Sequence, residues 1–546
     1  MAAIRWSQGH IHCLLRIPTI LAILPPMGEI CVLSHMEARV SHSAGLVRAG
    51  LLVLALLAGC AAPVRHDAEV GLSDSEKAAL GFEQDIGFVD DPELLAYVES
   101  IGHRIARQGQ RSDVDFRFNI LDMPIANALA LPEGQIFVSR GMLILVNTED
   151  ELAGILAHEI AHVEEHHAAE RKGLTVVLSP IRFGAGIAGW ATGLIIPDLG
   201  DAIVDLGEST SGLVLAPYSR EQEREADRVG QFLAAAAGYQ PTGLVNLLDT
   251  MANAELLDPE NVHEQDFFDS HPETAERVEL ASGYAGSLIP AARPGSARER
   301  REVIGELQGL VIGEDPANGF FDENWFVHPE LAFTIGFPLG WKGINTSGFV
   351  GAKAPEEETF VMLALVGEGT DPMAGAKAAS RKLDTDLFAD AKRGIVNGLP
   401  AAKNQTQFIA GEGDIQQMEL TWIAYGGLIY QIMAVATVER FEAVEALMRR
   451  SAHSFRPLGD EERSQIPITQ LQVLEGEGGE SIAEFAERVE TPWSAEAISV
   501  VNRKPVTETL EAGEPMKVGI QRSYATRLRP APRVSREPPP VTRPGP

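Results

Sequence analysis

The stretch His158-Glu159-Ile160-Ala161-His162 places two imidazole side chains four residues apart, with a glutamate beside the first. An α-helix turns once in about 3.6 residues, so side chains at positions i and i+4 lie on one face and direct both imidazoles to one point. Zinc bound there lowers the pKa of a coordinated water, and a carboxylate within hydrogen-bond reach then takes its proton. The spacing therefore predicts hydrolytic chemistry at a zinc ion, with Glu159 as the general base.

The residues that flank this motif predict a helix around it. Thr148 and Glu151 have the spacing of a capping box, which marks a helix start. Beyond them, apolar residues recur at helical spacing, at Leu152, Ile155, Leu156, Ile160 and Val163. The motif alone is equally compatible with a coincidence on a helix surface. A third metal ligand must therefore lie elsewhere in the chain.

A second predicted helix carries acidic side chains that complete such a site. It begins with a capping box formed by Ser219 and Gln222, and Gly238 is a candidate C-terminal stop. Glu223 and Asp227 share one face of this helix. Catalytic zinc is commonly bound by two histidines and a carboxylate, with one position left for water, and a ligating imidazole usually donates its other N–H group to a further carboxylate. We therefore expect Glu223 to be the third ligand and Asp227 to orient a histidine.

Other charged and imidazole side chains near these motifs have a simpler interpretation. Acidic runs on a helix usually form a solvated face, and we expect this of Glu221 and Glu225. The same interpretation is the alternative for Glu223 and Asp227. His166 and His167 lie just beyond the first motif, and a histidine without further evidence is more often structural or exposed than a ligand.

With these residues in place, the chain resembles the zinc metallopeptidases of family M48, which include the CAAX prenyl proteases, HtpX and the periplasmic BepA-like proteases. Residues 127–143 are similar to the family's NAFALPGGxIxVxxGLL stretch, which forms an edge strand beside the cleft. Here Leu129 replaces a phenylalanine and Glu133 a glycine. The family's HExxH and SRxxExEAD motifs match residues 158–162 and 219–227.

The resemblance covers residues 68–290 and implies an α+β protein whose first domain is a mostly helical, gluzincin-type metallopeptidase with a small β-sheet. The zinc ligands that it implies are His158, His162 and Glu223. It implies Glu159 as the general base and Asp227 as the residue that orients a histidine. These roles agree with those expected from the spacing.

Two further roles come from the resemblance alone. In Ser270-His271-Pro272, His271 matches a histidine that in BepA-like proteins occupies the open zinc position and holds the enzyme latent. The edge strand is implied to bind an extended substrate by main-chain hydrogen bonds. The residues of that substrate strand are Asn127, Ala128, Ala130 and Pro132.

Residues 174–197, between the two zinc motifs, form a glycine-rich apolar stretch in which Arg182 is the only charge. The length approaches that of a membrane span. Pro180, the glycines and the arginine disfavour a helix exposed to lipid. We expect a segment that covers the cleft, as in the resembling periplasmic proteins, with membrane-surface contact as the alternative.

The N-terminal region, residues 1–59, is predicted to be an extension followed by a lipoprotein signal peptide. Arg48 precedes a short apolar run, which suits a signal-peptide core better than a transmembrane helix. Leu57-Ala58-Gly59-Cys60 resembles a lipobox, so Cys60 is the expected lipidation site, and translation is expected to start at Met36. No aspartate follows the cysteine, which favours a periplasmic protein tethered to the outer membrane.

Composition narrows the classes of function. The chain has 546 residues, enough for several domains, and 45% of them are hydrophobic, which supports folded cores. Its net charge of -32 repels phosphate backbones and disfavours a nucleic-acid partner. Of its three cysteines only Cys60 would survive the expected processing, so the mature chain would have no internal disulfide.

The remainder is expected to hold two smaller domains. Residues 291–324 are turn-rich and predicted to be a linker with one short helix. Residues 325–458 contain strand-like runs, one of them interrupted by Gly426-Gly427, and an amphipathic helix near its end. We predict a small α+β domain of unknown role, in which Trp341 and Trp422 are core residues rather than ligand contacts.

Residues 466–521 resemble a divergent LysM module, with the order strand, helix, helix, strand. Gly478-Gly479-Glu480 replaces the usual Gly-Asp-Thr-like turn, so the fold is expected to persist while contact with peptidoglycan stays open. Residues 522–546 are rich in proline and arginine and are expected to be an extended, disordered tail.

The sequence is compatible with two functions. The first is a membrane-tethered zinc metalloendopeptidase that acts on misfolded or stalled envelope proteins. The second is a latent, chaperone-like scaffold lipoprotein that binds such proteins with little proteolysis. The complete set of zinc motifs favours the first, and a covered cleft with His271 at the metal would favour the second.

Overall fold

The computed structural model describes residues 73–170, 217–257, 267–272, 275–292, 298–346, 348–355, 359–382, 390–410 and 414–524. The predicted signal peptide with Cys60, the apolar stretch 174–197 and all but the first residues of the predicted tail lie outside these ranges. Within the described part of the chain, no helix combines the length and the apolar character needed to cross a bilayer.

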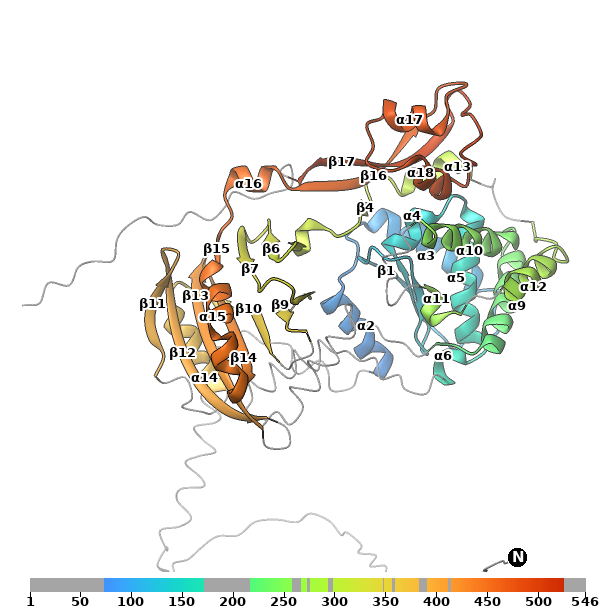
Figure 1. Cartoon of the computed structure of the whole chain (residues 1–546). Coiled ribbons are helices and arrows are strands. Elements are labelled where there is room, and N and C mark those ends of the chain that lie inside the picture. The colour runs from blue at the N-terminus through green and yellow to red at the C-terminus, as the bar shows by residue number, and fades with distance from the viewer. Residues whose placement is uncertain are drawn as a thin grey trace, which may run out of the picture. The chain divides into compact units, whose positions relative to one another are not determined.

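The first half of the described chain is mostly helical with one small sheet, as predicted (Figure 1). Its helices are α2 (Asp74–Asp85), α3 (Pro92–Ala106), α4 (Arg140–Leu145), α5 (Glu149–Glu164), α6 (His167–Glu170), α9 (Arg220–Ala236), α10 (Thr242–Glu255), α11 (Phe267–Ser270), α12 (Ala275–Ala285) and α13 (Arg300–Glu306). Its strands are β1 (Arg117–Leu121), β2 (Ala128–Ala130) and β3 (Gln135–Ser139). The sheet order is β1-β3-β2, with β1 parallel and β2 antiparallel to β3, so β2 is an edge strand as expected.

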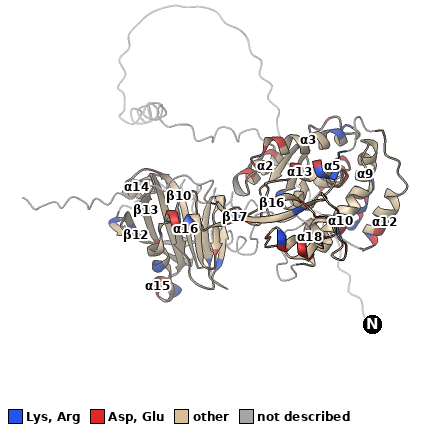
Figure 2. Ribbon diagram, turned by 90° about the horizontal axis from the view of Figure 1, so that it is seen from above, with Lys and Arg blue, Asp and Glu red and all other residues tan. Residues whose placement is uncertain are grey.

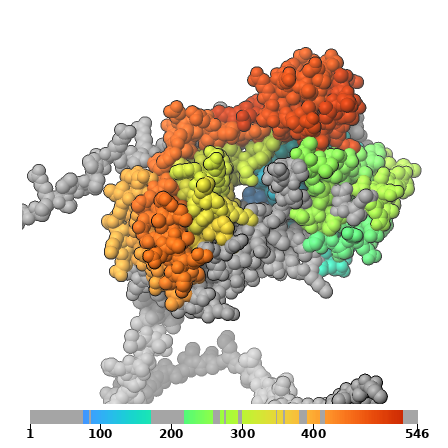
Figure 3. Space-filling model, viewed as in Figure 1, coloured from blue at the N-terminus to red at the C-terminus, as the bar shows by residue number. Residues whose placement is uncertain are grey.

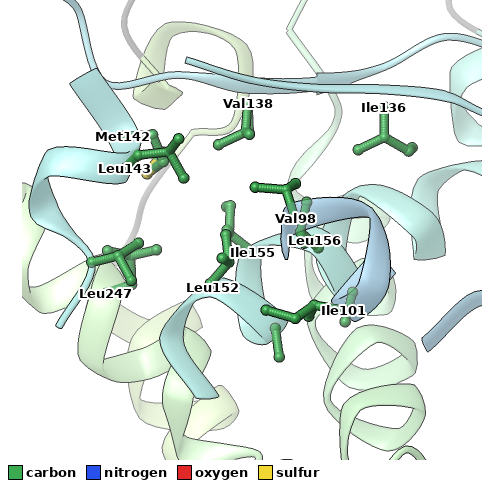
Figure 4. Close-up of a cluster of buried hydrophobic side chains, with 14 of the residues drawn as sticks. Val98, Ile101, Ile136, Val138, Met142, Leu143, Leu152, Ile155, Leu156 and Leu247 are labelled. Atoms are coloured by element: carbon green, nitrogen blue, oxygen red, sulfur yellow. The ribbon is translucent and has the colours of Figure 1, made fainter. Parts of the chain in front are cut away.

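Helix α5, which carries the HExxH motif, is the central helix of this half. The predicted capping box is present, since Thr148 accepts from Glu151 N and the Glu151 side chain accepts from Thr148 N. Leu152, Ile155 and Leu156 are buried against α3 and β3 (Figure 4). Every residue from Glu151 to Val163 is buried, so α5 is enclosed on all sides rather than amphipathic.

Two glycines let α10 cross α5 closely. A Cβ atom at Gly154 would lie 2.4 Å from Leu244 N, and one at Gly243 would lie 1.9 Å from Asp150 O. These neighbours are backbone atoms that cannot rotate away, so a larger side chain at either position would push the helices apart. The small residues thus fix the depth at which the motif helix is buried.

The second half is rich in antiparallel strands. A seven-stranded sheet has the order β11-β12-β13-β14-β10-β9-β8, and a four-stranded sheet the order β15-β7-β6-β5. The elements are β4 (Val311–Ile312), η1 (Pro316–Asn318), β5 (Phe320–Asp322), β6 (Trp325–His328), β7 (Phe333–Gly336), β8 (Lys342–Asn345), β9 (Phe349–Lys353), β10 (Phe360–Glu368), α14 (Pro372–Lys382), β11 (Lys392–Val396), β12 (Leu399–Ala410), β13 (Asp414–Tyr425), β14 (Leu428–Thr437), α15 (Val438–Ser454), β15 (Arg456–Pro457) and α16 (Asp460–Ser464).

This strand-rich region builds its own cores. Gly426 and Gly427, both at positive φ, turn β13 into β14 at the predicted interruption. Trp422 is fully buried, as expected of a core residue, and its ring nitrogen donates to Gln431. Helix α15 packs on β13 and β14 and forms part of the outer surface (Figure 3). The seven-stranded sheet carries few charged residues, whereas charged residues are more frequent on the helices (Figure 2).

The C-terminal segment has the predicted order of elements, β16 (Pro467–Glu475), α17 (Ile482–Arg488), α18 (Ala495–Asn502) and β17 (Pro515–Ser523). β16 and β17 pair antiparallel, and β4 joins β16 as a third strand. β4 comes from the stretch predicted to be a linker. That stretch also contains α13, whose Val303 and Ile304 are buried.

The C-terminal segment is joined by hydrogen bonds to the end of α4 and the start of α5. The buried Lys517 Nζ donates to Ile144 O at 2.7 Å and to Val146 O at 2.6 Å. Arg503 Nη1 donates to Glu151 Oε1 at 2.9 Å. We call this set of contacts the C-terminal joint.

Candidate metal centre

Two neighbouring helices bring the predicted ligands together. α5 contributes His158 and His162, and α9 contributes Glu223, all with no exposed side-chain surface. α9 begins with the predicted capping box of Ser219 and Gln222. A Cβ atom at Gly230 would lie 2.9 Å from both Ala157 O and His158 N, so glycine at this position allows α9 to approach the backbone of α5.

The donor atoms have the spacing of a tetrahedral metal site. His158 Nε2 lies 3.1 Å from His162 Nε2, and each lies 3.5 Å from an oxygen of Glu223. A tetrahedral metal with bonds of about 2.0–2.1 Å places neighbouring donors about 3.3 Å apart. Two imidazoles and a carboxylate are also the donor types that zinc takes in catalytic sites. The residues therefore fit a metal ion of this kind.

His271, from the turn after α11, supplies a fourth donor. Its Nδ1 atom lies 3.0 Å from Glu223 Oε1 and 3.3 Å from His158 Nε2. The four donor atoms all lie within 4.8 Å of one another. The imidazole is fully buried and stacks on Phe267 with the ring centroids 4.3 Å apart. The sequence-predicted regulatory residue is thus adjacent to all the predicted ligands.

The predicted base and orienting residue also lie at this cluster. Glu159 is fully buried, and its Oε1 atom lies 3.6 Å from His271 Nε2. Asp227 Oδ1 lies 3.0 Å from His158 Nδ1, which is the nitrogen that faces away from the donor cluster. A carboxylate at this nitrogen fixes the ring orientation of the imidazole.

Arg277, on α12, was not among the predicted site residues. It is 2% exposed and forms two bonds to Asp227, Nε to Oδ2 at 2.6 Å and Nη2 to Oδ1 at 2.9 Å. Its Nη1 atom also lies 2.7 Å from Glu223 Oε2 and donates to His271 O at 3.3 Å. One signal was available in the sequence. Arg277 shares a helix face with Ala281 and Ala285, and an arginine on an apolar face needs an acidic partner.

The protein groups alone set distinct charge states in the cluster. Burial lowers the pKa of His162 well below its usual value, which leaves its imidazole neutral. Burial also opposes the charged form of His158, but hydrogen bonds to Asp227 and Glu223 outweigh burial and raise the pKa of His158 to about 9. The pKa of Glu223 lies well below its usual value despite burial, because His271 and the hydrogen bonds of the histidines favour the carboxylate. Glu223 is therefore ionised, as a metal ligand must be.

The predicted substrate strand lies next to the cluster. Asn127, Ala128 and Ala130 are buried, Pro132 is half-buried, and β2 packs on α5. Phe267 N, at the start of α11, donates to Ala126 O at 3.1 Å. The segment that carries His271 is therefore attached directly before this strand. Cys60, the predicted lipidation site, lies outside the described residues.

Comparisons with known proteins agree with this geometry. Residues 92–285 match the sequence profile of Peptidase family M48. The chain is 33% identical over 159 residues to the mitochondrial metalloendopeptidase OMA1 of Schizosaccharomyces pombe, covering 29% of this chain and 44% of that one. It is 23% identical over 260 residues to the beta-barrel assembly-enhancing protease of Escherichia coli, covering 44% and 52%. It is 31% identical over 223 residues to the human mitochondrial metalloendopeptidase OMA1, covering 39% and 40%. The chain thus spans about half, or less, of the length of these relatives.

Proposed function

We propose that this chain, in which residues 92–285 form a peptidase family M48 domain, is a zinc-dependent metalloendopeptidase that hydrolyses peptide bonds in misfolded or stalled envelope proteins. The observation that carries the proposal is the buried cluster of His158, His162 and Glu223, with the carboxylate of Glu159 beside it. Zinc bound there supplies a Lewis acid and lowers the pKa of water at the site.

The protein residues have separate tasks in this proposal. His158 and His162 would hold the metal through their Nε2 atoms, which lie near the Glu223 carboxylate, and Glu223 would add one negative charge. Glu159 accepts the proton of the attacking water and later donates it to the leaving amine. Asp227 accepts a hydrogen bond from His158 Nδ1 and so keeps the Nε2 lone pair directed at the metal.

His271 gives this site a latent form. Catalytic zinc sites keep one position for water, whereas structural sites have four protein ligands. With its Nδ1 atom at the donor cluster, His271 would take that fourth position, and its Nε2 atom lies 3.6 Å from Oε1 of the proposed general base Glu159. This arrangement supports, as a second candidate function, a chaperone-like scaffold lipoprotein with little proteolysis. A movement of the segment at residues 267–272 would convert one state to the other.

The substrate and location belong to the same proposal. The edge strand β2 would bind an extended polypeptide by main-chain hydrogen bonds. These bonds recognise an extended backbone rather than particular side chains. Such binding suits unfolded proteins. The name of the Escherichia coli relative, a beta-barrel assembly-enhancing protease, supports the cell envelope as the place of action. Acylation at Cys60 would tether the chain in the periplasm at the outer membrane, and the C-terminal segment is proposed as a LysM-like module with a role at peptidoglycan.

A comparison of the wild-type protein with Glu159→Gln tests the enzymatic function. Both proteins are incubated with an unfolded protein substrate, and zinc content is measured in both. We expect equal zinc and a loss of cleavage of at least about a hundredfold in the variant, since general-base catalysis contributes roughly 10²–10⁴-fold. Equal weak cleavage by both proteins would instead favour the scaffold.

The latent state is tested with His271→Ala. We expect cleavage to rise by several-fold while zinc content stays at one ion per chain, because three ligands remain. Phe268→Ala, on the same short helix, is the matched control, since Phe268 is only partly buried and supplies no donor atom. Unchanged cleavage in His271→Ala with an unchanged zinc site would remove the regulatory role.

A further inference from the structure

His162 has a second imidazole on the side that faces away from the metal cluster. His162 Nδ1 lies 3.2 Å from His167 Nδ1, and His167 Nε2 lies 3.4 Å from Glu225 Oε2. His167 is 3% exposed, which agrees with the structural role and not with the exposed role among the two that the sequence left open. Glu225 was expected to belong to a solvated face, and its side chain is indeed 44% exposed. The three side chains form a line from the metal cluster to the surface.

A local break in the backbone produces this contact. In a continuous helix, His166 would lie four residues beyond His162 on the same face, and His167 would point away. α5 ends at Glu164, however, and His166 has a φ of 64°, in the left-handed region. The chain then restarts as α6 at His167, which turns this residue back beneath His162. Periodicity alone therefore indicates the wrong histidine of the pair.

Metal binding at His162 would determine which ring nitrogen of His162 and of His167 carries a hydrogen. His162 uses the lone pair of Nε2 towards the metal, so its Nδ1 atom carries the hydrogen and donates. His167 Nδ1 must then be the acceptor, which leaves the hydrogen of His167 on Nε2. That N–H group points to Glu225 Oε2, which accepts. Each hydrogen bond from His162 to Glu225 therefore has one donor and one acceptor, and no additional proton is needed.

We propose that His167, supported by Glu225, is a positioning residue that holds the imidazole of His162 in the orientation for metal binding. The inference rests on the proposed zinc site and adds a residue pair to it. His158 has the carboxylate of Asp227 at the equivalent nitrogen, whereas His162 has the imidazole of His167. The two metal-binding histidines are thus oriented by different chemical groups. Tyr218 is stacked on His162 at a centroid distance of 3.8 Å and restrains the plane of the imidazole ring. Stacking does not determine which ring nitrogen faces the metal cluster, and the hydrogen bond with His167 does.

Zinc affinity, measured by competition with a chromogenic chelator, tests this role in the full-length protein. His167→Leu removes the acceptor, and we expect zinc to bind about 10–100-fold more weakly, the usual loss when an outer partner of a ligand is removed. His167→Asn keeps an acceptor, because Oδ1 of asparagine is bonded to Cγ as Nδ1 is in histidine, and should bind zinc within about threefold of wild type. His166→Asn is the matched control, since asparagine also adopts the left-handed region and His166 lies outside the line, so its zinc affinity should be unchanged.

The pattern across the variants separates positioning from general stability. Equal affinity of His167→Leu and wild type would overturn the proposal, as would an equal loss in the asparagine and leucine variants. Should His167→Leu fail to fold, Glu225→Leu decides, with several-fold weaker zinc binding in support and unchanged binding against. The readout is independent of proteolysis. A wild-type protein that binds zinc but cleaves nothing would defeat the proposed peptidase and leave the role of His167 standing, whereas a wild-type protein without zinc binding would defeat both.

Discussion

The metal centre and the C-terminal joint both bury charged side chains completely, yet they do so with different partners. At the metal centre, Arg277 has two carboxylates within hydrogen-bond distance, those of Asp227 and Glu223. At the joint, Lys517 is equally buried, but its amine donates to two main-chain carbonyl groups and, among the described residues, to no carboxylate. Burial, and to a smaller extent the nearby positive charge of Arg300, lowers the pKa of Lys517 well below its usual value, against a weaker opposing effect of Glu151. The pKa of Asp227 is lowered as well, since the hydrogen bonds from Arg277 and His158 outweigh its burial.

The contrast shows what each region requires. A buried charge with an opposite partner depends on that partner, because removing either one leaves an unpaired charge. A buried amine that meets only carbonyl groups behaves more as a hydrogen-bond donor on a long apolar stem. We therefore expect substitutions at the metal centre to cost more stability than those at the joint, and to change metal binding as well.

The largest effect is expected from Arg277→Met. The methionine keeps much of the side-chain volume but leaves Asp227 and Glu223 without their cation in a buried site. Removing one partner of a buried ion pair costs about 3–5 kcal/mol. We expect a loss of that size in the free energy of unfolding, measured by urea denaturation, and about 10–100-fold weaker zinc binding because Asp227 no longer holds His158 firmly.

The double variant Arg277→Met/Asp227→Asn identifies the cause of that loss. It removes one of the unpaired carboxylates, so it should be more stable than Arg277→Met alone, although its zinc affinity stays low. A double variant that is less stable than the single one would show that packing of the guanidinium, rather than charge, holds this part of α12. The contrast between the two regions would then disappear.

The metal centre was largely predictable because its chemistry prescribes residue types and spacings. His158 and His162 are fixed by the helical period, and the capping boxes at Thr148 and Ser219 locate both helices. The spacing of the motifs could not predict which residue contacts a metal-binding histidine on the side away from the metal. His167 lies at its place because the helix breaks at His166, and such a break depends on tertiary packing that a local pattern does not contain.

The C-terminal joint was not predictable in this way. Its members are an ordinary lysine, an arginine, a glutamate and main-chain groups, and the partners are separated by more than 350 residues in the chain. No chemical rule requires them to meet. The order of elements in residues 466–521 was predicted correctly from the resemblance to a LysM module, but the face of the segment that packs against α4 and α5 is decided by shape in three dimensions. The fold of a small segment is thus easier to predict than its packing partner.

At the joint itself, we expect Lys517→Ala to destabilise the protein by about 2 kcal/mol. The alanine leaves two buried carbonyl groups without a donor, which costs roughly 1–3 kcal/mol each, but it also relieves the burial of an amine. Lys517→Met is the matched variant, because it keeps the long stem and loses only the amine. Its free energy of unfolding, measured by urea denaturation, should be closer to that of wild type than the value for Lys517→Ala. A loss above about 4 kcal/mol in the methionine variant would place the joint in the same class as the metal centre.

The smallest effect is expected from Arg503, which pairs with Glu151 at the rim of the joint. Its side chain is 32% exposed, and Glu151 also accepts from Asn147 N at 2.6 Å, so the loss of the arginine leaves Glu151 with a donor. Arg503→Ala should cost about 1 kcal/mol, as for a partly exposed ion pair. Arg503 has a φ of 51°, so Arg503→Gly relieves a left-handed backbone while losing the same pair, and its stability should lie near that of wild type.

Zinc affinity should be unchanged in both variants, because the capping box at Thr148 still begins α5. If zinc binding weakened in either of them, the joint would act on the metal helix through Glu151, and the two regions would have to be treated as one coupled unit.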